Sequence, residues 1–116
     1  MKVIKEIEAE IATLVSFVEN NYKKDSPKMF TREKGRMVFL RHVILFLETN
    51  PSEDYMRREA ARLDKLITSL ESQFETWTKN TPPDAPPSKY KAIFSKEMGL
   101  TLLRLQRKTA YYILND

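Results

Sequence analysis

Apolar residues recur at helical spacing along most of the chain, and these stripes predict four helices. The most regular one runs from Met56 to Trp77, where apolar residues follow one another in unbroken steps of four and three. Steps of this kind place all of them on one face of an α-helix. Similar patterns and their flanking capping residues predict helices at about residues 2–22, 31–49, 51–79 and 88–114.

The most apolar stretch is Met37–Leu47, in which only Arg41 and His42 are not plainly apolar. Such a run favours burial, so we expect the apolar stripes of the other three helices to cover it. The sequence therefore predicts an all-α fold, a four-helix bundle. We expect Arg41 and His42 to form a polar spot in the core of this bundle or at its rim.

Proline positions predict how the helices are connected. Asn50 followed by Pro51 is typical of a tight corner at which a new helix starts, which would make the two flanking helices antiparallel neighbours. Residues 80–87 contain four of the six prolines and should run extended, as a crossover to the last helix. Gly99, in the middle of that helix, suggests a close backbone approach there.

The last predicted helix is apolar over an unusually wide arc. Its main stripe consists of Tyr90, Phe94, Met98, Leu102, Leu105, Thr109 and Tyr112. Either this helix packs between two others, or part of the arc is an interface with another chain.

Length and composition narrow the class of protein. A chain of 116 residues predicts one helical domain, 1–116, and the absence of cysteine excludes disulfides, thiolate metal sites and cysteine nucleophiles. It also fits a reducing compartment, so we expect a cytoplasmic protein. The longest apolar run has eleven residues, against the roughly twenty of a membrane-spanning helix, and the N-terminus does not resemble a secretory signal. We expect no membrane insertion.

Few residues could support catalysis or bind a metal. A dinuclear carboxylate site in a helical bundle needs Glu-x-x-His pairs, and the chain has none. His42 is the only histidine and stands in the apolar run, so no base is evident for a serine or threonine nucleophile. We expect a protein without a cofactor, a metal or an evident small-molecule substrate.

Arg36 precedes His42 by six positions, and this spacing resembles the arginine–histidine motif of helical RNases of the HEPN type. The resemblance covers that motif alone and implies RNA cleavage that depends on the histidine. Met37 stands where that family has a polar residue. Six residues turn a helix by roughly 600°, which places Arg36 and His42 on different faces.

Basic residues outnumber acidic ones by 20 to 16, a mildly basic balance that favours contact with nucleic acid without requiring it. The candidate nucleic-acid contacts are Lys23, Lys24, Lys28, Arg32, Lys34, Arg36, Arg104, Arg107 and Lys108. The simpler interpretation is that these side chains are solvated at helix ends.

Aromatic residues indicate the candidate contacts for a protein partner, because such residues often anchor interfaces. They are Trp77, Tyr90, Phe94, Tyr111 and Tyr112; alternatively, they cap the core. The sequence as a whole predicts a non-catalytic interaction, structural or adaptor protein, a subunit of a homo-oligomer or larger assembly. Phage-type accessory proteins are an analogy in composition only. The alternatives are a nucleic-acid-binding accessory protein and a HEPN-like RNase.

Overall fold

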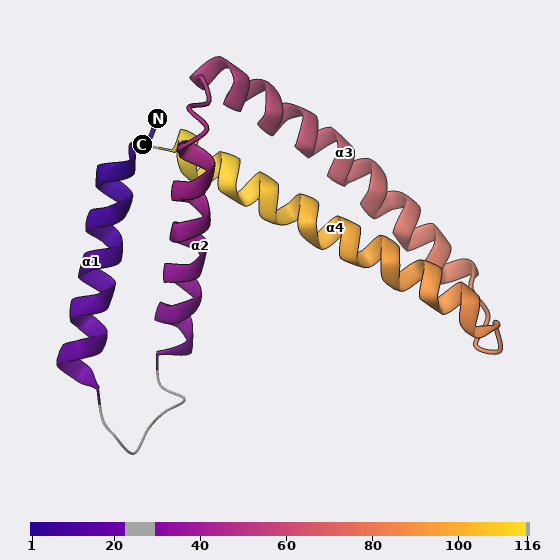
Figure 1. The fold of residues 1–116 in the computed structure, drawn as a ribbon. Helices are drawn as coiled ribbons and strands as arrows, with labels where there is room; N and C mark the ends of the chain where they lie inside the picture. Colours follow the sequence, from indigo (N-terminus) through magenta and orange to yellow (C-terminus); the bar gives the residue numbers. More distant parts are fainter. Residues whose placement is uncertain (23–29, 116) are drawn as a thin grey trace. The chain divides into compact units, whose positions relative to one another are not determined.

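A computed structural model of the chain describes residues 1–22 and 30–115. These residues form four α-helices and no strand (Figure 1). The helices are α1 (Ile4–Asn21), α2 (Thr31–Leu47), α3 (Glu53–Asn80) and α4 (Pro87–Leu114). The predicted all-α class with four helices is confirmed, and this content agrees with a four-helix bundle. Each helix end lies within two residues of its predicted position.

The helices belong to two compact units. The α1–α2 unit comprises the chain up to Ser52 together with the end of the chain from Ile113 onward. The α3–α4 unit comprises Glu53–Tyr112. That the two together form one domain, 1–116, stays a prediction.

In the α1–α2 unit, the two helices pack against each other over one face of α2. The buried residues of α2 are Phe39, Leu40, Val43 and Leu47, and Ile7 of α1 is fully buried. A hydrogen bond of 2.8 Å from the Lys2 amide to the Ile113 carbonyl joins the two ends of the chain.

The expectation that the whole run Met37–Leu47 is buried is wrong. Val38 and Leu45 are both 65% exposed, and Arg41 and His42 are exposed as well. A helix buries only the face that its neighbours cover, and these four residues lie outside that face of α2.

Asn50 lies in the turn that follows α2, whose C-cap is Glu48, and it is three residues before the start of the next helix, which corrects the predicted role of the Asn50-Pro51 pair. Its φ of 60° lies in the left-handed region, which asparagine adopts more readily than most residues. Its amide donates to the Leu47 carbonyl over 2.9 Å. The next helix begins only at Glu53.

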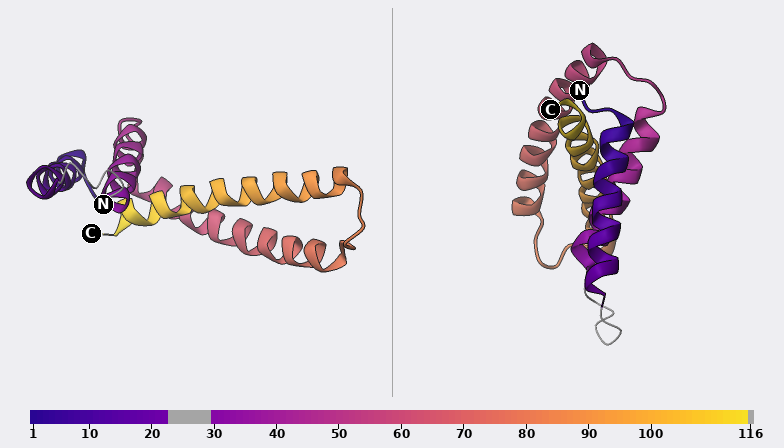
Figure 2. Two further views of the ribbon diagram at one scale, coloured as in Figure 1. Left: turned by 90° about the horizontal axis from the view of Figure 1, so that it is seen from below. Right: turned by 90° about the vertical axis from the view of Figure 1, so that its left-hand side faces the viewer.

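In the α3–α4 unit, the two long helices lie side by side (Figures 1 and 2). Their shared core contains Leu63 and Ile67 of α3 with Leu100 of α4, and Leu70 and Leu103 pack against it. The predicted α3 stripe is therefore confirmed at its centre.

Residues 80–87 connect neighbouring helices, so the predicted crossover is wrong. The Ala85 amide donates to the Pro82 carbonyl over 3.0 Å, a turn that reverses the chain. The Tyr90 hydroxyl contacts the carbonyls of Pro82 and Pro83 at 3.0 and 3.1 Å and so ties the first turn of α4 to this connection. A proline-rich segment that contains such a turn folds back and does not span the length of a helix.

Within the described residues, no helix is both long enough and apolar enough to cross a membrane.

Candidate interaction surface on α4

A row of exposed apolar side chains runs along α4, and we call it the α4 stripe. Its members are Tyr90, Phe94, Met98, Leu102 and Leu105. Each of them is between 40% and 62% exposed, although all belong to a helix whose other side is packed. The two remaining residues of the predicted stripe are covered, because Thr109 is buried and Tyr112 is half-buried.

Helix geometry explains why α3 leaves the α4 stripe uncovered. Leu100 and Leu103 face α3, and they are turned from Met98 by about 200° and about 140° around the helix axis at 100° per residue. The α4 stripe therefore lies on the side of α4 that faces away from α3. Within the α3–α4 unit, α4 therefore has one face packed against α3 and one open face. Both arrangements that the wide apolar arc allowed stay predictions.

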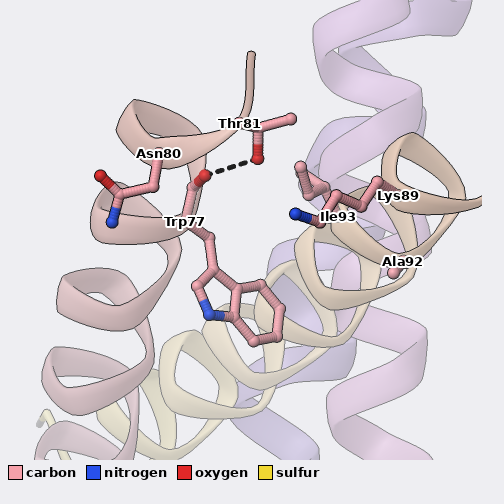
Figure 3. A pocket seen from close by; sticks show the side chains of 6 residues that line it. All are labelled: Trp77, Asn80, Thr81, Lys89, Ala92 and Ile93. Atoms are coloured by element: carbon pink, nitrogen blue, oxygen red, sulfur yellow. Dashed lines mark hydrogen bonds between the residues drawn. The ribbon is translucent and has the colours of Figure 1, made fainter. Parts of the chain in front are cut away.

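A second feature is a pair of small cavities beside Trp77, both between α3 and α4. One has a volume of about 250 Å³ and is shown in Figure 3, where Trp77 of α3 stands opposite Lys89 and Ile93 of α4. The other, of about 190 Å³, is lined by Trp77, Gly99 and other residues of both helices. Both are smaller than the roughly 300–1,000 Å³ of typical small-molecule sites, and their size suits single side chains.

Trp77 has one contact to its indole ring and one to its backbone carbonyl. The Lys96 ammonium lies 5.3 Å from the ring centroid, within the range of a cation–π interaction. The Thr81 hydroxyl donates to the Trp77 carbonyl over 2.7 Å, which closes the last turn of α3 (Figure 3). Trp77 nevertheless remains substantially exposed.

The five predicted partner contacts form two groups. Trp77, Tyr90 and Phe94 lie near the α3–α4 connection. Tyr111 and Tyr112 lie about 25 Å further along α4, because seventeen residues separate Phe94 from Tyr111 at 1.5 Å each. Sequence reasoning placed Met98, Leu102 and Leu105 on the same stripe but left them out of the partner contacts. The helical spacing of these three residues from Phe94 is the signal that could have identified them as partner contacts.

Two of the basic residues predicted to contact nucleic acid form ion pairs with acidic residues of α3. Arg104 of α4 pairs with Glu71 of α3 at 3.2 Å, and Arg107 pairs with Asp64 at 3.5 Å. Arg104 is exposed despite this pairing, as are Arg32, Lys34 and Lys108. Three further candidates, Lys23, Lys24 and Lys28, lie outside the described residues.

Arg36 and His42 lie on different sides of α2. The Arg36 guanidinium binds the Glu10 carboxylate of α1 at 3.0 Å and lies 5.4 Å from the centroid of the Phe39 ring. His42 is exposed, as is Arg41, so the predicted polar spot does not lie in the core, and the alternative position at the rim of the bundle stays a prediction. Burying a charged or polar group without a partner costs free energy, so these two side chains are favoured on the open face of α2.

Shifted pKa values occur away from the α4 stripe. The hydrogen bond to Asp64 raises the pKa of Tyr111 above its usual value, and burial and the Asp64 charge add to this effect. On the surface of α3, the hydrogen bond from Arg62 lowers the pKa of Glu59. The described residues contain no group of three or more histidines and carboxylates placed to hold a metal ion. The arrangement on α4 is thus suited to binding through apolar contact.

No protein-family model, curated protein sequence or solved structure matches this chain significantly. The function is therefore argued from the residues and contacts described above.

Proposed function

We propose that this chain is a non-catalytic interaction protein, a subunit of an assembly in which the α4 stripe binds another protein chain. The observation that carries the proposal is the exposure of five large apolar side chains on the face of α4 that points away from α3. Contiguous exposed apolar surface of this kind is often an interaction site.

The size of the α4 stripe supports this role. A large side chain has a surface of roughly 150–250 Å², so five of them at about half exposure present on the order of 500 Å². This lies in the range of the largest apolar patches on ordinary monomers, which are often functional. The surface is also rigid, because the opposite side of α4 is held against α3 by the core contacts of Leu100 and Leu103 and by the ion pairs of Arg104 and Arg107. A rigid surface loses little conformational entropy when a partner binds.

The two alternatives stay predictions. For a nucleic-acid-binding accessory protein, the ion pairs of Arg104 and Arg107 with acidic residues of α3 offset part of the positive charge on α4. For a HEPN-like RNase, Arg36 and His42 would have to act from different sides of α2.

The proposal is tested by placing charge in the α4 stripe. Phe94→Asp with Leu102→Asp should shift the chain from a larger species to the mass of a monomer. The measurement is light scattering after gel filtration of the purified protein, and gel filtration of a tagged chain in extract from cells that express it. Ser69→Asp with Ser72→Asp, at two exposed positions of α3, adds the same charge elsewhere and should change nothing. An unchanged mass for the Phe94/Leu102 variant would overturn the proposal.

A stability comparison tests whether the α4 stripe belongs to the core of the folded monomer. Leu63→Ala removes a fully buried side chain and should lower the free energy of unfolding by about 2–5 kcal/mol. Leu102→Ala removes an exposed one and should lower it by no more than about 0.5 kcal/mol at concentrations where the chain is monomeric. Equal losses in urea denaturation would show that the stripe is a folding surface and not a binding surface.

A further inference from the structure

The exposed face of α4 has a symmetric pattern. The pattern consists of four residues of the α4 stripe together with Lys91, which stands next to Tyr90. Its members are Lys91, Phe94, Met98, Leu102 and Leu105. They are spaced by three, four, four and three residues, so the spacing is the same in both directions from Met98. All five side chains are exposed. A two-fold symmetric contact brings each residue on one side of the axis against the residue at the matching position on the other side, so equal spacing lets these side chains meet in pairs.

We propose that the partner of the α4 stripe is a second copy of this chain, with the two α4 helices antiparallel and the two-fold axis at Met98. This inference rests on the proposed function and specifies the partner. The axis brings Met98 against Met98 of the second copy and Phe94 against Leu102 of the second copy. Each large ring thus meets a smaller side chain, and the flexible methionines fill the space at the centre.

The charge pattern selects the antiparallel orientation. Lys91 is the one charged residue in the five-residue pattern. In a parallel pair the two Lys91 side chains would face each other, and like charges in an apolar contact repel. In the antiparallel pair each Lys91 lies against Leu105 of the second copy. There its aliphatic stem covers the leucine, and the ammonium group reaches water at the edge.

The area available agrees with a reversible dimer. Two stripes of about 500 Å² would bury at most on the order of 1,000 Å² in total, the lower bound for a specific interface. This predicts association that depends on concentration, in contrast to the larger interfaces of obligate dimers. Tyr90 lies at the edge of the contact, where its hydroxyl group keeps its hydrogen bonds to the α3–α4 connection.

Cysteine cross-linking tests the inference directly, because the chain contains no cysteine. Met98→Cys should form a disulfide-linked dimer under mild oxidation, since a disulfide requires Cα atoms less than roughly 7 Å apart. Phe94→Cys alone should cross-link poorly, because the two copies of this residue are separated by about two turns. A mixture of Phe94→Cys and Leu102→Cys chains, distinguished by a mass tag, should form the mixed dimer. Ser69→Cys on α3 is the control and should form no disulfide-linked dimer.

The outcomes separate this inference from the proposed function. Efficient cross-linking of Phe94→Cys with itself, or no cross-linking of Met98→Cys, overturns the antiparallel pairing. Either result can occur while the Phe94/Leu102 charge variant still lowers the mass from a larger species to a monomer. In that case the proposed function stands, and only the identity or orientation of the partner is wrong. If the wild-type chain is monomeric at all concentrations, purified and in extract, both are overturned.

Discussion

Tyr111 on α4 donates its hydroxyl hydrogen to the carboxylate of Asp64 on α3, a residue 47 positions earlier in the chain. Arg107, one turn before Tyr111, pairs with the other oxygen of the same carboxylate at 3.5 Å. Asp64 is thus shared by two consecutive turns of α4. Because a hydrogen bond and an ion pair tolerate little displacement, these contacts define the register of α3 against α4.

Tyr111→Phe should therefore destabilise the α3–α4 unit. The substitution keeps the ring and removes one hydrogen bond to a charged acceptor that is partly exposed. We expect a loss of about 0.5–1.5 kcal/mol in the free energy of unfolding, measured by urea denaturation near neutral pH. Tyr22→Phe, at an exposed tyrosine after α1, should stay within about 0.5 kcal/mol of wild type. Equal effects of the two substitutions would show that the Asp64 bond contributes nothing.

The same bond predicts a dependence on pH. The pKa of Tyr111 is raised in the folded protein, so its contribution to stability is complete below the unfolded value of about 10. The contribution is lost as the pH rises through the folded pKa, because the unfolded chain releases the proton first. The stability difference between wild type and Tyr111→Phe should be constant from about pH 7 to 9 and shrink above about pH 10. A difference that grows in alkali would contradict this.

The pair of Arg36 and Glu10 should couple α1 to α2. A double-mutant cycle with Arg36→Ala and Glu10→Ala is expected to give a coupling energy of about 0.5–1 kcal/mol, near the upper end for exposed pairs, because both side chains are partly covered. Salt should weaken this coupling. The position of Arg36 over Phe39 adds a contribution that remains when Glu10 alone is removed. A coupling energy near zero at low salt would show that the ion pair is not maintained in solution.

Gly99→Ala should stabilise the chain. The sequence suggested a close backbone approach at this position, but a Cβ atom placed on Gly99 meets nothing within 4 Å, so that expectation is wrong. Alanine is favoured over glycine inside a helix by about 0.8–1.0 kcal/mol. Thermal and urea denaturation should both show the gain, and Gly35→Ala in α2, where the space is equally open, should behave alike. A loss of stability at Gly99 would reveal a neighbour that packs there.

His42→Ala should leave stability within about 0.5 kcal/mol of wild type, because its side chain is exposed on α2. The adjacent Val43 is fully buried, and Val43→Ala should cost about 2 kcal/mol through lost burial and a small cavity. Circular dichroism during urea denaturation compares the two. His42→Ala is then also the clean variant for the RNase alternative, since any lost RNA cleavage would not reflect unfolding.

The sequence alone determined where the helices are, because helix formation depends on spacing, capping and proline positions that are local in the chain. The stripes from Met56 to Ile67 and from Tyr90 to Leu105 could be identified in this way. Two of the five residues of the α4 stripe, Tyr90 and Phe94, were also among the predicted partner contacts. Whether that contact occurs stays a prediction. The sequence could not say which apolar stripe would be covered.

Only the tertiary structure decided which faces are buried, because burial depends on the neighbour that each face meets. It placed α4 against α3 and left Phe94 and Leu102 open, and it exposed Arg41 and His42 although their flanking residues are apolar. It also paired Arg104 and Arg107 with carboxylates that are distant in the sequence. Such pairings depend on the register between two packed helices. The spacing of residues within either helix does not determine that register.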